Sequence, residues 1–271
     1  MIRCNGITVK VHKFPDGTLF FDKSIGNVFN ITPNGYMSRN ESFIEWFFEN
    51  NEEMSILWFL VCHLRDNGIN SIDLFMPYIP NARMDRVKSK NEVFTLKHFA
   101  KFINTLGFNE VTVLDPHSPV SAGLFDRIDI LSPQEYIDSA IEKCAPDMLF
   151  FPDEGAMKRY SSMANKKYAF GIKRREWETG TIEGLDVAGC VDKINGSKIM
   201  IVDDICSRGG TFYYSAKKLR ELGASEVYLC ITHCENTILE GEVLTGDLIE
   251  RVYTTNSIFT KEHEKIEVFE L

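Results

Sequence analysis

The sequence predicts an α/β protein with mainly parallel sheets flanked by helices, and three observations support this prediction. Runs of apolar, β-branched residues alternate along the chain with segments of helical periodicity. The run 199–202 is apolar throughout, as in a parallel strand buried on both faces. Carboxylates and glycines follow several runs, at the strand ends where open parallel sheets bind their ligands.

The first half of the chain begins with a hairpin and continues with alternating helices and strands. Pro15-Asp16-Gly17 is a turn signal that predicts the hairpin. Two segments with helical spacing of apolar residues end before Gly68 and Gly107, which predicts two helices. The expected strands of this half cover 7–12, 19–21, 72–76 and 111–114, and the expected helices cover 53–66 and 94–106.

The second half continues the alternation around a central strand and the helix that follows it. The apolar run 199–202 predicts the strand, and Tyr214, Lys217, Leu219 and Leu222 give the helical spacing. The other expected elements are a helix over 133–144 and strands over 148–151, 168–173, 227–232 and 248–253.

A break near 126–132 is the expected boundary between two domains. The chain of 271 residues is long enough for two medium domains with a core each. The expected domains cover 1–127 and 128–253, each with a short run of β-α-β units. The tail, 254–271, can pack back onto either domain, including the first.

Composition is that of an ordinary globular protein and excludes some partners. Hydrophobic residues make up 44% and charged residues 25% of the chain. With 30 Lys+Arg against 39 Asp+Glu, the net charge is -9, so no basic excess exists to bind nucleic acid. No apolar run approaches the ~20 residues that a membrane span needs. We therefore expect neither nucleic acid nor membrane as a partner.

Cysteine usage indicates the cytoplasm. The seven cysteines are an odd number and form no Cys-x-x-Cys pair. Cys230, His233 and Cys234 lack the second ligand pair of a zinc site. Reduced thiols in a reducing compartment are the simplest interpretation.

The central motif joins two carboxylates to a glycine loop. Asp203 and Asp204 end the apolar run, and Gly209-Gly210 precede the helical segment. Glycines allow close backbone approach, so an anion can bind at the start of the next helix. Carboxylates would repel that anion, and their natural partners are ribose hydroxyls or hydrated Mg²⁺. The motif predicts a site for a sugar phosphate and a metal.

Two further carboxylate or histidine positions follow predicted strands. His117, in Asp115-Pro116-His117, can bind a metal or a phosphate, and it can equally be a hydrogen-bonded edge histidine. Asp153, which precedes Gly155 and a helical segment, can hold Mg²⁺ or sugar hydroxyls, or act as an ordinary N-cap.

Two clusters of cations could bind phosphoryl groups. Lys173-Arg174-Arg175 ends a predicted strand and could neutralise a transferring phosphoryl group, or form a solvated basic turn. Arg83 and Arg86 follow another strand and could meet a triphosphate, or pair with Asp85.

Taken in order, these segments resemble the ribose-phosphate diphosphokinases, also called phosphoribosyl-diphosphate (PRPP) synthetases. The resemblance spans nearly the whole chain. The matching motifs are Phe14-Pro15-Asp16-Gly17, Pro77-Tyr78, Ala82-Arg83-Met84-Asp85-Arg86, Asp115-Pro116-His117, Gly123-Leu124-Phe125-Asp126, Pro152-Asp153, Lys173-Arg174-Arg175 and Val202-Asp203-Asp204 with Gly209-Gly210-Thr211. The resemblance implies two phosphoribosyltransferase-like domains, the first for ATP and the second for ribose 5-phosphate.

The family transfers the β,γ-diphosphoryl group of MgATP to the 1-hydroxyl of ribose 5-phosphate, giving PRPP and AMP for nucleotide or NAD synthesis. The resemblance implies catalytic roles for Lys173 and Arg175 and Mg²⁺ binding by His117 and Asp153. The implied ATP-binding residues are Phe14, Asp16, Gly17, Thr18, Arg83, Met84, Asp85 and His117. The implied ribose 5-phosphate-binding residues are Asp203, Asp204, Ser207, Arg208, Gly209, Gly210 and Thr211. It also implies a homo-oligomer, either a dimer or a larger assembly such as a hexamer.

Departures from the family pattern fall at binding positions. The phosphate loop usually begins Asp-Thr, and here it begins Ser207-Arg208, which makes the loop more cationic. Thr18 and Met84 replace the usual Glu and Gln near ATP, which leaves nucleotide preference open. The alternative functions are a base phosphoribosyltransferase that consumes PRPP and a non-catalytic regulatory homologue.

Overall fold

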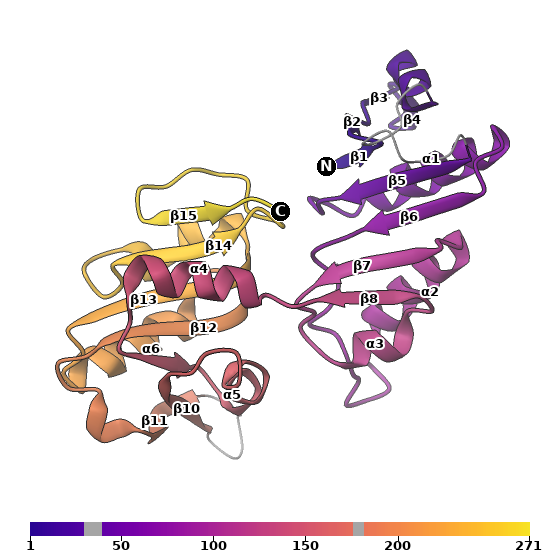
Figure 1. The fold of residues 1–271 in the computed structure, drawn as a ribbon. Helices are drawn as coiled ribbons and strands as arrows, with labels where there is room; N and C mark the ends of the chain where they lie inside the picture. The colour runs from indigo at the N-terminus through magenta and orange to yellow at the C-terminus, as the bar shows by residue number, and fades with distance from the viewer. Residues whose placement is uncertain (30–39, 176–181) are drawn as a thin grey trace. The chain divides into compact units, whose positions relative to one another are not determined.

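The computed structural model describes residues 1–29, 40–175 and 182–271, without the side chains of 173–175 and 182–185. The chain forms two compact units, Met1–Leu131 and Ser132–Leu271 (Figure 1). Each is built on a mainly parallel sheet with helices, which confirms the predicted α/β class. Among the described residues, no helix is long and apolar enough to cross a membrane.

The first unit contains a six-stranded sheet in the order β2-β1-β5-β6-β7-β8, in which β5 to β8 run parallel. Its strands are β1 (Ile2–Cys4), β2 (Ile7–Thr8), β5 (Glu41–Trp46), β6 (Ser71–Phe75), β7 (Glu110–Leu114) and β8 (Ile128–Leu131). The helices are α1 (Glu53–Asp66), α2 (Thr95–Leu106) and α3 (Val120–Leu124), with the 3-10 helix η1 (Lys23–Phe29). Leu57, Leu60 and Leu64 form the buried stripe of α1, as the spacing predicts.

The predicted hairpin is shorter than expected from the sequence. β3 (Val11–Lys13) pairs with β4 (Leu19–Phe21) around the predicted turn, in a separate two-stranded sheet. Ile7–Thr8 instead pairs with β1, so the predicted strand 7–12 is wrong as a single element. The chain changes partner between the two short strands, and alternation of side chains alone does not reveal such a change.

The second unit contains a seven-stranded sheet in the order β11-β10-β9-β12-β13-β14-β15, parallel except for the β10–β11 pair. Its strands are β9 (Met148–Phe151), β10 (Lys167–Arg175), β11 (Ile182–Gly189), β12 (Lys198–Cys206), β13 (Glu226–Cys234), β14 (Arg251–Thr255) and β15 (Ile266–Phe269). The helices are α4 (Gln134–Cys144), α5 (Glu154–Tyr160) and α6 (Gly210–Glu221), with the 3-10 helices η3 (Val191–Lys193), η4 (Asn236–Glu240) and η5 (Glu242–Leu244).

The central strand β12 contributes to the core on both faces of its sheet. Ile199 and Ile201 pack in one buried cluster, which includes Leu219 of α6. Met200 and Val202 pack in another, which includes residues of α4 and α5. Helices therefore cover both faces, and the carboxyl end of β12 lies in the middle of a buried sheet.

The domain limits differ from those expected from the sequence. The boundary between the units falls between Leu131 and Ser132 rather than at 127/128. The reason is that β8 pairs in parallel with β7 and belongs to the first sheet. The tail belongs to the second unit, since β15 pairs with β14 and extends the second sheet. The last predicted strand, 248–253, is found slightly later, at Arg251–Thr255.

Candidate active site

The paired carboxylates and the glycine loop lie at the carboxyl end of β12. Asp203 and Asp204 are within the last residues of the strand, and Ser207 and Arg208 form the bend that follows. Gly209 has φ 78°, a left-handed conformation that favours glycine, and α6 begins at the next residue. The first amides of α6 lack partners within the helix, and its dipole favours an anion there. The local chemistry is that of a phosphate-binding loop.

The segment 236–244, which contains η4 and η5 and is called the η4–η5 segment below, packs directly against this loop. A Cβ added to Gly241 would lie 1.8 Å from the carbonyl oxygen of Arg208. A Cβ added to Gly209 would lie 2.6 Å from Cγ1 of Val243. Both distances are too short for real carbon contacts. Gly241 therefore allows the backbone of the η4–η5 segment to approach that of the loop, and Gly209 leaves room for the Val243 side chain.

One arginine forms hydrogen bonds with both carboxylates of the central motif. Nη2 of Arg159, on α5, donates to Oδ1 of Asp204 at 2.6 Å and to Oδ1 of Asp203 at 3.2 Å. The two carboxylate side chains are only 16% and 3% exposed for Asp203 and Asp204. Burial, together with the neighbouring Asp204 charge, raises the pKa of Asp203 well above its usual value. One guanidinium thus contacts two neighbouring carboxylates.

Asp153 lies at the same edge of the sheet, on the neighbouring strand. It follows β9, which pairs in parallel with β12, so the carboxyl ends of both strands meet. Oδ1 of Asp153 accepts a hydrogen bond from the amide of Ala156 at 3.1 Å and caps α5. The N-cap interpretation is therefore correct, and the half-buried Asp153 follows the strand that neighbours β12.

The basic triplet ends the strand on the other side of β9. β10 is parallel to β9 and extends to Arg175, so the backbone of Lys173 and Arg175 reaches the same edge. Their side chains and residues 176–181 lie outside the described part of the chain.

In the first unit, four predicted residues lie in loops that follow strands β6 and β7 of the six-stranded sheet: Arg83, Met84, Asp85 and His117. His117 is half-buried in the loop between β7 and α3, after Asp115, which has φ 41°. Arg83 and Met84 are exposed in the loop that follows β6. Asp85 forms a long ion pair of 3.8 Å with Arg86, as the alternative interpretation of this cluster predicts. His117 and Asp153 are in different units, so their joint metal binding stays a prediction.

The hairpin places the other ATP-binding candidates on one exposed face and its turn. The ring of Phe14, 51% exposed, packs against Phe20 with centroids 4.5 Å apart, and His12 lies 5.2 Å from Phe20. In the turn, Gly17 has φ 85°, and Oδ1 of Asp16 accepts hydrogen bonds from the amide and hydroxyl of Thr18. These bonds lower the pKa of Asp16, which keeps this exposed turn negatively charged.

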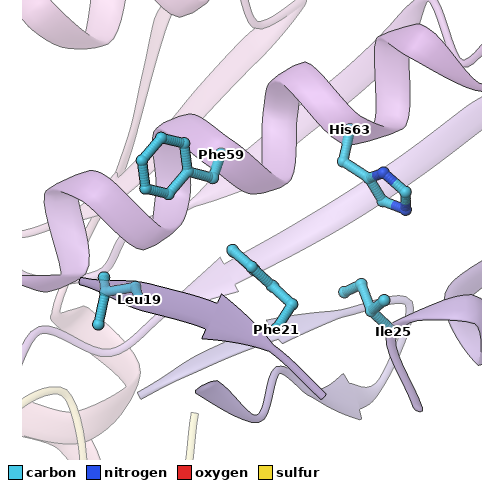
Figure 2. A pocket seen from close by; sticks show the side chains of 5 residues that line it. All are labelled: Leu19, Phe21, Ile25, Phe59 and His63. Atoms are coloured by element: carbon cyan, nitrogen blue, oxygen red, sulfur yellow. The ribbon is translucent and has the colours of Figure 1, made fainter. Parts of the chain in front are cut away.

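The opposite face of the hairpin closes an apolar cavity of about 280 Å³ against α1 (Figure 2). In Figure 2, Phe21 of β4 points toward α1 between Phe59 and His63, with Leu19 on one side of it and Ile25 on the other. None of the described residues that line this cavity is a predicted site residue. The hairpin therefore has an apolar face toward the helix and an aromatic face toward solvent.

Neither Arg159 nor the η4–η5 segment was predicted from the sequence. Arg159 lies on α5, 44 residues before Asp203, so no local pattern links it to the two carboxylates. The η4–η5 segment has no motif of its own, and only the close approach of Gly241 reveals its contact with the loop.

Curated relatives and solved structures show what the chain is similar to, although no family model matches it. It is 33% identical over 227 residues to the ribose-phosphate pyrophosphokinase of Bacillus subtilis, covering 81% of this chain and 70% of that protein. It is 27% identical over 263 residues to the enzyme of the same name from Pyrococcus furiosus, covering 93% and 86%. The phosphoribosylpyrophosphate synthetase of Mycobacterium smegmatis has the same fold, with a TM-score of 0.75 at 22% identity, over 97% of this chain and 86% of that one.

Fold and site together define an α/β protein with a phosphate-binding loop beyond paired carboxylates. The relatives narrow this class to one family, because the sequence similarity to them extends over both units of the chain. The chain belongs to the ribose-phosphate pyrophosphokinase family.

Proposed function

We propose that the chain transfers the β,γ-diphosphoryl group of MgATP to the 1-hydroxyl of ribose 5-phosphate. The observation that carries this proposal is the pair Asp203 and Asp204 before the glycine loop, in a member of this family. A bond forms between the 1-oxygen of the sugar and the β-phosphorus. The bond from that phosphorus to the oxygen it shares with the α-phosphorus breaks, AMP leaves with this oxygen, and the hydroxyl proton is released.

The second unit binds ribose 5-phosphate in this proposal. The loop Ser207–Thr211 takes the 5-phosphate, because its backbone conformation and the start of α6 suit an anion. Asp203 and Asp204 accept hydrogen bonds from the ribose hydroxyls, which replace part of their contact with Arg159. Such a clamp orients the 1-hydroxyl, and orientation is a large part of catalysis of phosphoryl transfer.

The first unit binds ATP in this proposal. The exposed rings of Phe14 and Phe20 offer a stacking surface for the nucleobase, with Asp16, Gly17 and Thr18 at the turn beside it. Arg83 contacts the phosphates, and Met84 and Asp85 lie next to it in the same loop. A stacking surface that is this exposed also supports a homo-oligomer, a dimer or larger, in which a neighbouring subunit covers the bound base.

The residues present fit Mg²⁺, which we propose arrives with the nucleotide. Mg²⁺ is usually bound by one or two carboxylates besides substrate phosphates and water. The carboxylate of Asp153 is such a ligand, and His117 would hold the ion with it. When bound, the ion neutralises charge on the β- and γ-phosphates. We also propose a cytoplasmic location, supported by seven cysteines that form no disulfide in the structure, which describes all of them.

The test is to incubate the protein with MgATP and ribose 5-phosphate and to identify the nucleotide product. We expect AMP in equal amount to PRPP, and no AMP when ribose 5-phosphate is omitted. ADP as the product would indicate an ordinary kinase, and no nucleotide consumption would favour a non-catalytic homologue. Either result contradicts the proposal.

Lys173→Ala is expected to lower kcat at least about 100-fold, since a cation that stabilises charge in the transition state is lost. Affinity for ribose 5-phosphate should stay nearly unchanged, because the phosphate loop and the carboxylates are on another strand. Lys167→Ala is the matched control, since Lys167 begins the same strand at the opposite edge. Steady-state kinetics and calorimetry separate the two effects, and an equal loss of kcat and affinity would remove Lys173 from its proposed role.

A further inference from the structure

The arginine that departs from the family pattern in the phosphate loop has a partner in the η4–η5 segment. Nη2 of Arg208 donates to Oε2 of Glu240 at 3.0 Å. The side chains of Arg208 and Glu240 are 72% and 60% exposed, so the pair contributes little to stability. The loop is therefore not as cationic as the sequence indicates, because a carboxylate already neutralises the added charge.

The backbone keeps Glu240 beside the loop. Gly241, the next residue, approaches the carbonyl oxygen of Arg208 so closely that no side chain fits between them. The amide of Glu235, the residue just before the segment, also donates to the carbonyl oxygen of Cys206 at 2.8 Å. These two backbone contacts keep residue 240 beside the loop, within reach of the Arg208 side chain.

We infer, on the basis of the proposed function, that Glu240 sets the affinity for sugar phosphates by competing for Arg208. A phosphate monoester carries more charge than a carboxylate and can accept two parallel hydrogen bonds from one guanidinium. Ligand binding therefore transfers Arg208 from Glu240 to the 5-phosphate. Substrate and product carry the same 5-phosphate, so Glu240 weakens both complexes and favours release of the product.

The experiment measures ribose 5-phosphate binding by calorimetry for the wild type and for Glu240→Gln. We expect Glu240→Gln to tighten binding about two- to fivefold, the range that an exposed ion pair allows. Glu242→Gln is the matched control, because it removes the same charge from an exposed position two residues along the segment. Arg208→Thr should weaken ribose 5-phosphate binding. In the Arg208→Thr background, Glu240→Gln should tighten binding no more than Glu242→Gln does.

Kinetics separate competition for Arg208 from a merely structural role. Glu240→Gln should lower the KM for ribose 5-phosphate without changing the KM for ATP, and Glu240→Asp should restore part of the wild-type value. If Glu240→Gln changes the affinity for ribose 5-phosphate no more than Glu242→Gln does, or weakens binding, the inference is wrong while the proposed function stands. A wild type that binds no ribose 5-phosphate would instead overturn the proposed function, and this inference with it.

Discussion

Gly241→Ala is expected to raise the KM for ribose 5-phosphate at least about tenfold, since displacement of a binding group by about 1 Å can have an effect of this size. The added methyl would lie 1.8 Å from the carbonyl oxygen of Arg208, and only a backbone shift relieves this contact. The shift must move the phosphate loop or the η4–η5 segment, and either movement changes the pocket proposed for the 5-phosphate.

The control for this substitution is Gly26→Ala, since nothing lies within 4 Å of the Cβ added at Gly26 and its φ is not positive. Steady-state kinetics on both variants, with thermal unfolding to show that each folds, measure the effect. A KM for ribose 5-phosphate equal to that of the wild type in a folded Gly241→Ala protein would show that the loop does not bind the phosphate.

Arg159→Leu is expected to destabilise the protein by about 3 kcal/mol at pH 8, because the buried Asp203 and Asp204 carboxylates then lose the guanidinium that contacts both of them. The pKa of Asp203 is already raised in the folded protein, so its contribution to stability is fully present at low pH. That contribution is lost as the pH rises from the unfolded pKa, near 3.8, toward the higher folded value. The loss caused by Arg159→Leu should therefore be smaller at pH 5 than at pH 8.

Two further variants test this account of the carboxylates. Lys158→Leu is the matched control, since Lys158 is the exposed neighbour on α5 and its pair with Glu154 is expected to contribute little. Asp203→Asn should restore part of the stability in the Arg159→Leu background while it impairs ribose 5-phosphate binding. Denaturant unfolding at both pH values measures these effects, and a pH-independent loss would show that Arg159 acts by packing alone.

Buried strands of the sheets were largely predictable from the sequence. Met148–Phe151 is found with the predicted bounds, because a strand buried on both faces is apolar at every position. β5 (Glu41–Trp46) was missed because polarity does not follow burial in it: Ser42 is buried and Phe43 is only half-buried, so the apolar/polar alternation of a strand is broken. β11 and β15 were also missed. They lie at the edges of the second sheet, where fewer positions are buried and the apolar signal is weaker.

The candidate site was predictable where the residues are close in sequence. Asp203, Asp204 and Gly209 belong to one strand and its loop, so strand end and turn chemistry place them together. The contacts of Arg159 with Asp203 and of Arg208 with Glu240 join different elements. Such contacts depend on how strands and helices pack, and no local pattern contains that information.

The close packing of the η4–η5 segment at Gly209 and Gly241 has a consequence for how this loop can diverge among related proteins. The segment packs against the loop through the backbone at Gly241 and the Val243 side chain at Gly209, so the side chains of Ser207 and Arg208 take no part in these two close approaches. Replacements such as Ser207 and Arg208 can then alter charge and ligand preference while the backbone of the phosphate loop keeps its conformation. Evolution, or a protein engineer, could retune this pocket one side chain at a time, provided that both glycines remain.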